Sequence, residues 1–204
     1  GLLTEESDDD RSRLEKDKVW IVDPLDGTKE FLKKNGEFTV NIALVSQGAP
    51  VLGVIYLPAK EELFWAARGL GAHRESGDEE EDLAVSDRSS FEEMVVVRSR
   101  SHASPDLQAI LDRAGFPEAK PAGSSLKGCL IAAGEADAYF RLGDTMEWDI
   151  CAMDAILREA GGALTSLDGK PLKYNTESPR IRGFVASNGR AHHDLVGLVP
   201  HGQA

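Results

Sequence analysis

The sequence is poor in cysteine and in long apolar runs, and both shortages limit what the protein can be. Cys129 and Cys151 lie in apolar surroundings without CxxC spacing or nearby histidines, so we expect buried, reduced thiols rather than a disulfide framework or a zinc site. No apolar run has the length needed to cross a bilayer, and the first residues, GLLTEESDDD, do not resemble a signal peptide. We therefore expect a soluble, cytoplasmic protein without a transmembrane segment.

Basic residues are also scarce relative to acidic ones. The chain has 23 Lys and Arg against 35 Asp and Glu, which gives a formal net charge of -12. Phosphate backbones and anionic membranes repel such a surface, so a nucleic-acid polymer is not an expected partner. If the substrate is itself a small anion, the field must be reversed locally where it binds, and bound divalent cations would do this.

What the sequence does contain is enough for one domain with a hydrophobic core: 204 residues, of which 41% are hydrophobic. We expect two lobes, about 1–98 and about 99–204. Short β-branched and apolar runs in the first lobe predict strands joined by turns into an antiparallel meander. These runs are 19–22, 40–45, 51–56, 63–67 and 94–98. The segment SGDEEED, residues 76–82, is interpreted as a solvated acidic loop.

The second lobe alternates helical and extended patterns, which predicts a layered α/β architecture. The expected helices are 105–114, 126–133, 148–160 and 192–198, and the expected strands are 138–141, 163–165 and 184–187. The pattern over 148–160 is apolar on nearly every face and stops at Gly161-Gly162. A buried helix with a glycine end is therefore predicted.

The motif DPLDGT, residues 23–28, follows the first predicted strand directly. A strand that ends in a sharp turn delivers the carboxylates of Asp23 and Asp26, with a backbone carbonyl between them, to one point, and hard cations prefer such oxygen ligands. Gly27 and Thr28 begin a short helix, 29–33, whose first N–H groups are able to hold a phosphate. Ordinary turn dipeptides are the alternative interpretation.

Charged residues that could meet a phosphate recur later in the chain. In GSSLK, residues 123–127, Lys127 is a compact point charge, and Arg141 ends a predicted strand with a fork suited to phosphate oxygens. A surface lysine and arginine remain the alternative. The SxxK pattern from Ser124 also occurs in penicillin-recognising enzymes, but their SDN and KTG partners are absent from the sequence. Asp149 could act simply as a favourable carboxylate at a helix start.

Together these motifs resemble the inositol monophosphatase superfamily. DPLDGT is similar to its DPxDGT signature, Glu5-Glu6-Ser7 to its glutamate motif, and Glu147-Trp148-Asp149 with its Gly-Gly helix end to its second aspartate motif. The residues Lys29-Glu30-Phe31 and the GSSLK segment resemble its bisphosphate nucleotidase branch. The likeness extends from Glu5 to about Val185. Met153 departs from it, since a small residue is common there.

The resemblance implies a sugar-phosphatase fold and a set of site residues. The implied metal ligands are Glu5, Asp23, the Leu25 carbonyl, Asp26 and Asp149, with Glu6 an alternative to Glu5. The implied catalytic residues are Thr28, Asp23 and Glu5, with Thr28 orienting the attacking water. The implied substrate-binding residues are Asp26, Gly27, Thr28, Ser124, Lys127, Arg141 and Asp149. Asp8, Asp9 and Asp10 are expected to form a solvated loop, and His102, after Ser99-Arg100-Ser101, is a minor candidate for nucleotide contact.

The implied reaction is hydrolysis of 3'-phosphoadenosine 5'-phosphate to AMP and phosphate, with roughly two or three Mg²⁺ ions and inhibition by Li⁺. The alternatives are a phosphatase for inositol monophosphate or fructose 1,6-bisphosphate, and a non-catalytic nucleotide- or metal-binding sensor. Family members also carry a pair of helices before the glutamate motif. Because Glu5 lies near the start of this sequence, we expect a fold without that pair, and apolar surface left uncovered would favour a homodimer.

Overall fold

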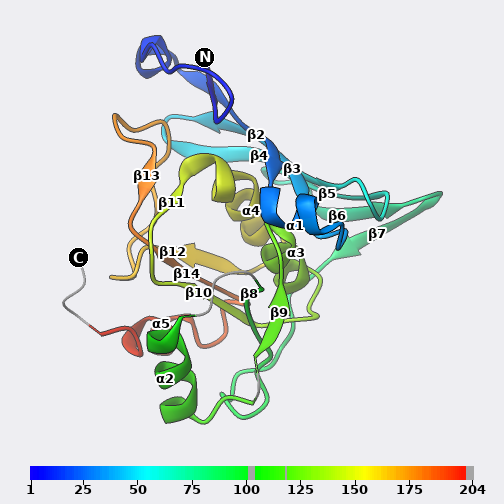
Figure 1. Cartoon of the computed structure of the whole chain (residues 1–204), viewed down its shortest axis with the longest axis vertical. Coiled ribbons are helices and arrows are strands. Elements are labelled where there is room, and N and C mark those ends of the chain that lie inside the picture. The colour runs from blue at the N-terminus through cyan, green and yellow to red at the C-terminus, as the bar shows by residue number, and fades with distance from the viewer. Residues whose placement is uncertain (101–103, 118, 201–204) are drawn as a thin grey trace.

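The first half of the chain folds into a seven-stranded sheet because its strands alternate apolar and polar residues between tight turns. The computed structural model describes residues 1–100, 104–117 and 119–200 (Figure 1). The strands follow chain order across the sheet: β1 (Leu2–Thr4), β2 (Lys18–Asp26), β3 (Thr39–Ser46), β4 (Ala49–Leu57), β5 (Glu62–Ala67), β6 (Gly71–Ser76) and β7 (Glu79–Leu83). β1 pairs with β2 in parallel and the others are antiparallel, so the predicted meander is confirmed for these strands. The run 94–98 is the exception, because its strand belongs to the second sheet.

The predicted acidic loop over 76–82 is wrong, because most of it lies in the hairpin of β6 and β7. Ser76 pairs with Glu79 across a turn in which Gly77 adopts a φ of 60°, a conformation that glycine reaches readily. The acidic side chains of β7 are exposed, and Arg74 forms an ion pair with Glu81 across the hairpin. A strand at a sheet edge tolerates this charge, and like charges discourage pairing with other chains.

The second half forms a five-stranded sheet in the order β12-β14-β10-β8-β9. These strands are β8 (Val96–Ser99), β9 (Lys120–Ala122), β10 (Ala138–Arg141), β12 (Ala163–Thr165) and β14 (Phe184–Ser187), and β11 (Thr145–Met146) pairs separately with β13 (Arg180–Ile181). Helices α2 (Pro105–Ala114) and α5 (His192–Gly197) form one hydrophobic cluster with side chains of this five-stranded sheet. Helices α3 (Leu126–Ala132) and α4 (Glu147–Glu159) share the main core with other side chains of the sheet. The layered α/β prediction is confirmed.

Helix α4 is apolar on nearly all faces because it lies between the two sheets (Figure 1). It packs directly on β4: a Cβ added at Gly53 would come within 2.4 Å of the Ala152 carbonyl oxygen. The helix ends at Glu159, and Gly161 takes the left-handed conformation that the glycine stop predicted. This packing fixes the start of α4, where Asp149 lies, relative to β2 and β3.

Most predicted elements are confirmed within a few residues, and apart from β6 and β7 the missed strands are very short. β1, β9, β11 and β13 have two or three residues each, too few for a periodic pattern. The 3₁₀ helix η1 (Ser12–Glu15) was also not expected, and α1 (Thr28–Lys33) matches the short helix predicted there. Both cysteines are buried and free. Among the described helices, none combines the length and apolar character needed to span a membrane.

Candidate metal and phosphate site

The DPLDGT motif lies where β2 stops following β3. Pairing between the two strands is interrupted between Asp23 and Asp26, and the Leu25 N–H donates to Oδ1 of Asp23 at 2.9 Å. Gly27 then turns the chain into α1 with a φ of 88°. Only glycine fits there, because an added Cβ would lie 2.0 Å from Oγ of Ser124. The turn therefore brings Asp23 and Asp26 to one side of the sheet end.

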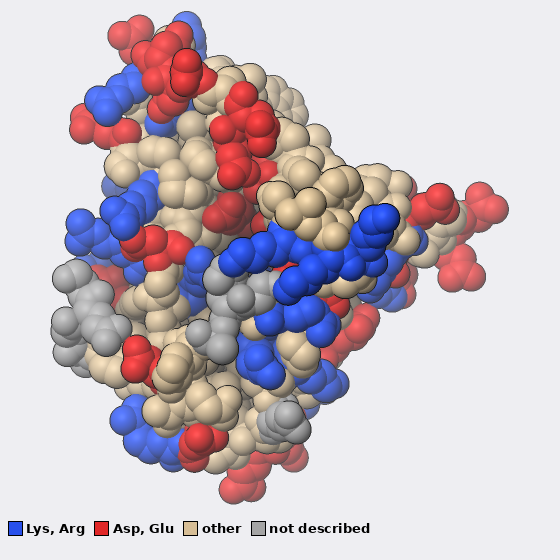
Figure 2. Space-filling view, in the orientation of Figure 1, with Lys and Arg blue, Asp and Glu red and all other residues tan. Residues whose placement is uncertain are grey.

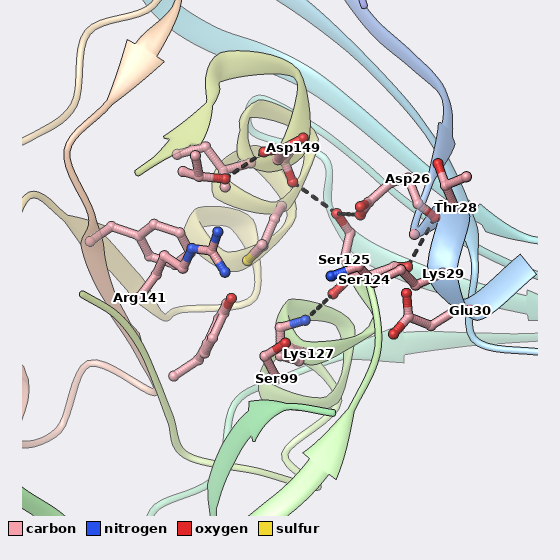
Figure 3. A pocket seen from close by; sticks show the side chains of 16 residues that line it. Asp26, Thr28, Lys29, Glu30, Ser99, Ser124, Ser125, Lys127, Arg141 and Asp149 are labelled. Atoms are coloured by element: carbon pink, nitrogen blue, oxygen red, sulfur yellow. Dashed lines mark hydrogen bonds between the residues drawn. The ribbon is translucent and has the colours of Figure 1, made fainter. Parts of the chain in front are cut away.

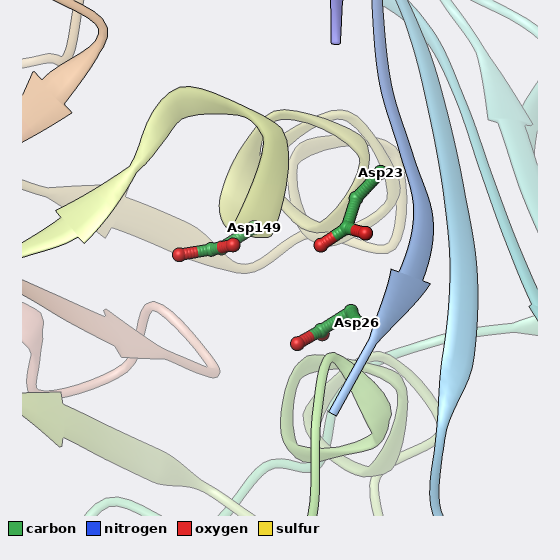
Figure 4. A group of neighbouring side chains, drawn as sticks. All are labelled: Asp23, Asp26 and Asp149. Atoms are coloured by element: carbon green, nitrogen blue, oxygen red, sulfur yellow. The ribbon is translucent and has the colours of Figure 1, made fainter. Parts of the chain in front are cut away.

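Asp149 reaches the same place from the first turn of α4. Carboxylate oxygens of Asp23, Asp26 and Asp149 all lie within 4.8 Å of one another, around a common space (Figure 4). These side chains come from the end of β2 and the start of a helix more than a hundred residues later. The predicted convergence of the two aspartate motifs is therefore found.

The cluster concentrates negative charge in a partly buried place. Burial first, and the neighbouring charge of Asp26 second, raise the pKa of Asp23 to about 8. Burial and the charge of Asp149 also raise the pKa of Asp26, against the opposing effect of Lys127. Carboxylates in such positions either hold protons or need a cation between them.

Hydrogen bonds orient two of these carboxylates. Oδ2 of Asp26 accepts from Ser125 Oγ at 3.0 Å and from Thr39 Oγ1 and Asn41 Nδ2 at 3.3 Å. Oδ2 of Asp149 accepts from the Thr145 hydroxyl and from the Met146 N–H at 2.9 Å. Because the bonds that described residues make to both side chains go to Oδ2, each Oδ1 is left for another partner. Oxygen donors held in this way fit a hard divalent cation.

Glu5 lies beside this cluster, in the turn that follows β1. The parallel register pairs Thr4 with Val22. Glu5 is the residue after Thr4 and Asp23 the residue after Val22, so the two are neighbours. Burial, then the negative charges of Asp149 and Glu6, raise the pKa of Glu5. The charge of Asp149 therefore acts on Glu5. Glu5 is otherwise exposed and does not belong to the closest group of carboxylates.

A cavity of about 230 Å³ opens beside the carboxylates. Of the predicted substrate-binding residues, those that line it are Asp26, Gly27, Thr28, Ser124, Lys127, Arg141 and Asp149. Arg141 extends into it from β10, on the side opposite Asp26 and Ser124 (Figure 3). The fold thus brings basic side chains to the cavity in which the carboxylates lie.

Lys127 is buried at the base of this cavity, so it is not an ordinary surface lysine. Its side chain is 5% exposed, and Nζ donates to the Ser124 carbonyl at 2.7 Å and lies 5.0 Å from the centre of the Tyr139 ring. Burial lowers the pKa of Lys127 to about 8, and the charge of Asp26 partly offsets this effect. A cation held in such surroundings suits a bound anion.

Several residues that contact the aspartates were not predicted from the sequence, among them Ser125, Thr39, Asn41 and Thr145. Ser125, which is buried, lies 2.8 Å from the Asp149 carbonyl oxygen and 2.9 Å from Asn41 Nδ2, so it joins α4, β3 and Asp26. Thr39 and Asn41 are buried polar residues of β3 at positions where the strand otherwise points apolar side chains inward. That break in the alternation is the signal that could have identified them.

Two other predictions concern the segments 99–102 and 8–10. Arg100 forms an ion pair with Glu37, and Ser99 lines the cavity. Ser101 and His102 lie outside the described residues. The prediction that Asp8, Asp9 and Asp10 form a solvated loop holds for exposure, but Asp9 is not free: it pairs with the buried Arg13 at 2.8 Å.

The face that holds the site is divided by charge. A band of Lys and Arg crosses its middle, over the region of α1, next to a column of acidic side chains (Figure 2). Lys29, Lys33 and Lys34 are exposed along and just after α1, and Lys29 also lines the cavity. Basic charge is therefore concentrated beside the cavity although the whole chain is acidic.

Comparison with known proteins agrees with this fold and site. The family model described as the inositol monophosphatase family matches residues 1–201. The chain belongs to the inositol monophosphatase family, and the resemblance predicted from its motifs is confirmed. An inositol monophosphatase from Anabaena superposes with a TM-score of 0.80 at 31% identity, over 98% of this chain and 79% of that one.

Within the family, the chain is similar to proteins named 3'(2'),5'-bisphosphate nucleotidase CysQ. The CysQ of Escherichia coli K12 is 45% identical over 171 residues, which cover 83% of this chain and 68% of the relative. The CysQ structure from Bacteroides thetaiotaomicron superposes with a TM-score of 0.82 at 41% identity, over 93% of this chain and 76% of that one. In the Salmonella typhimurium CysQ the match covers 62% of the relative's length.

Proposed function

We propose that the protein is a Mg²⁺-dependent 3'(2'),5'-bisphosphate nucleotidase that hydrolyses 3'-phosphoadenosine 5'-phosphate to AMP and phosphate. The observation that carries the proposal is the meeting of a carboxylate cluster with two basic side chains in one cavity. Similarity to several CysQ nucleotidases supports the choice of substrate within the family.

The carboxylates are the proposed metal site. Asp23, Asp26 and Asp149 would hold Mg²⁺, with Glu5 and the Leu25 carbonyl as further ligands, because these oxygen donors come from converging segments of the chain. Bound Mg²⁺ would lower the pKa of a coordinated water and neutralise the charge of the leaving oxygen. Two or three ions and inhibition by Li⁺ remain predictions.

The chain's own residues would bind and orient the ester. Thr28 is exposed at the cavity and would orient the attacking water through its hydroxyl. Gly27 and Thr28 present backbone N–H groups at the start of α1 toward the phosphate that is cleaved. The water oxygen forms a bond to phosphorus, the bond from phosphorus to the ribose 3'-oxygen breaks, and that oxygen takes up a proton.

The second phosphate of the substrate would bind Lys127, Ser124 and Arg141. Arg141 supplies positive charge on the side of the cavity opposite Asp26, and Lys127 supplies it beside Ser124. Oγ of Ser124 is fixed by its hydrogen bond to the Asp26 carbonyl at 2.9 Å. The exposed lysines of α1 would attract the anion to an otherwise acidic molecule. A monophosphate has no second phosphate group that Lys127, Ser124 and Arg141 could bind.

A phosphate-release assay with Mg²⁺ tests the proposal. The rates for 3'-phosphoadenosine 5'-phosphate, inositol 1-phosphate and fructose 1,6-bisphosphate are compared, and we expect the nucleotide to have the highest kcat/KM. Preference for either of the others would favour that phosphatase activity instead. Binding of the nucleotide without turnover of any substrate would indicate the non-catalytic sensor.

Mg²⁺ binding is expected to release a proton near neutral pH. With a pKa of about 8 in the metal-free protein, Asp23 is protonated at pH 7, whereas a metal ligand must be ionised. The apparent Mg²⁺ affinity should therefore rise about tenfold per pH unit from pH 6 to 8 and level off above that. Calorimetry in two buffers with different ionisation enthalpies measures the proton. Proton release that is absent in the wild type, or an Mg²⁺ affinity that does not change between pH 6 and 8, would contradict this account.

A homodimer and a cytoplasmic location remain predictions. The division into lobes at about residue 98 also stays a prediction.

A further inference from the structure

Arg13 and Glu147 are charged residues outside the aspartate cluster that are as deeply buried as the hydrophobic core. Arg13, in η1, is 1% exposed, and Glu147, the first residue of α4, is fully buried. Neither was assigned a role in the chemistry above. A buried charge is costly unless partners satisfy it, so each of these residues has to be fixed by its surroundings.

Both residues are fixed by two neighbouring residues, Asn175 and Thr176. Arg13 Nη1 donates to Oδ1 of Asn175 at 2.8 Å, and Asn175 Nδ2 donates back to the Arg13 carbonyl at 3.2 Å. The backbone N–H of Asn175 donates to Oε2 of Glu147 at 2.7 Å. Thr176 donates to Oε1 from its N–H at 3.0 Å and from its hydroxyl at 2.7 Å. Asn175 therefore contacts both charged residues.

The two charged residues lie in the segments that carry two proposed metal ligands: Arg13 follows the Glu5 loop, and Glu147 begins the turn that holds Asp149. Arg13 also donates from Nε and Nη2 to Asp9, which holds the loop between Glu5 and η1. Glu147 precedes Asp149 by two residues, at the start of α4. In Figure 1 the N-terminal segment and the segment that leads to β13 lie on the same side of the molecule, above α4.

We propose that Arg13, Asn175 and Glu147 form a positioning bridge that sets the distance between the Glu5 loop and the Asp149 turn, and thereby the affinity for Mg²⁺. This inference rests on the proposed metal site. The bridge residues touch neither substrate nor metal, so they act on the ligands through the backbone. Loss of a direct hydrogen-bond partner of a ligand typically costs 10- to 100-fold in metal affinity, and the bridge acts one step further out, so a smaller loss is expected.

The substitution Asn175→Gly tests the bridge with little disturbance of the backbone. Asn175 has a φ of 57°, which glycine adopts without strain, and its N–H to Glu147 is kept while the side-chain bonds to Arg13 are lost. Calorimetry on the metal-free protein should show Mg²⁺ affinity about three- to tenfold weaker, below the loss for a direct partner of a ligand, with kcat close to wild type once Mg²⁺ is saturating. Asn175→Asp, which keeps an oxygen for Arg13, should restore much of the affinity.

Tyr174→Phe, at the residue before Asn175, is the matched control. It removes a buried hydrogen bond from the Tyr174 hydroxyl to Asp154 at 3.0 Å, which lies away from the aspartate cluster. It should lower the melting temperature and leave Mg²⁺ affinity unchanged. Equal affinity in wild type and Asn175→Gly, or an equal loss in Tyr174→Phe, would overturn the bridge alone. Wild-type protein that binds no Mg²⁺ at all would overturn the proposed function as well.

Discussion

Asp26→Asn is expected to lower kcat/KM for the bisphosphate nucleotide by roughly 10³-fold or more. The substitution keeps the shape of the side chain and removes the charge that faces the cation and the cavity. When the amide oxygen takes the place of Oδ2 and accepts from the same three donors, the NH2 group takes the place of Oδ1 and cannot bind a cation. Phosphate release at saturating Mg²⁺ measures the loss.

The same variant should be at least as stable as the wild type when metal is absent. Burial and Asp149 raise the pKa of Asp26, so neutralising it removes a cost that the folded state bears. Asp154→Asn is the control: Asp154 is fully buried in the same helix as Asp149 and pairs with Arg158 at 2.7 Å, so its neutralisation should lower the melting temperature and keep turnover. Full activity in Asp26→Asn would refute the assignment.

Lys127→Met should change substrate preference rather than abolish catalysis. Methionine fills similar space without the charge, and a hydrogen bond to a charged group contributes about 1.5–3 kcal/mol, or roughly 10- to 150-fold. We expect a loss of that size in kcat/KM for 3'-phosphoadenosine 5'-phosphate. For inositol 1-phosphate, which has no second phosphate, the loss should stay within about threefold.

Lys33→Met separates local contact from general charge. Lys33 is exposed on α1, so this variant changes the net charge equally without entering the cavity. It should reduce kcat/KM only slightly, and more at low than at high ionic strength. Equal losses for both substrates in Lys127→Met would count against nucleotide specificity.

The parts of the site that the sequence predicted are those encoded in one continuous motif. DPLDGT specifies a strand end, a turn and a helix start within six residues, and Trp148-Asp149 begins a helix whose apolar pattern extends over several turns. Long periodic segments and glycine-marked turns depend on local interactions, so α2 and α4 were placed within about one residue.

Contacts between distant segments could not be predicted in this way. Ser125 and Asn41 act through neighbours far along the chain, and their role depends on β3 lying beside β2 and on α3 packing near α4. Arg13 looks like an ordinary loop arginine in the sequence, and only the fold places it against Asn175. The β6–β7 hairpin was missed because acidic side chains on an edge strand look like a solvated loop.

A double-mutant cycle on Mg²⁺ affinity tests most directly whether distant aspartates hold a common cation. Dissociation constants are measured by calorimetry for the wild type, Asp23→Asn, Asp149→Asn and the double variant. If both side chains bind one ion, either substitution removes most of the binding, and the double variant is little worse than the weaker single one. Losses that simply add would mean that the two aspartates do not share a cation.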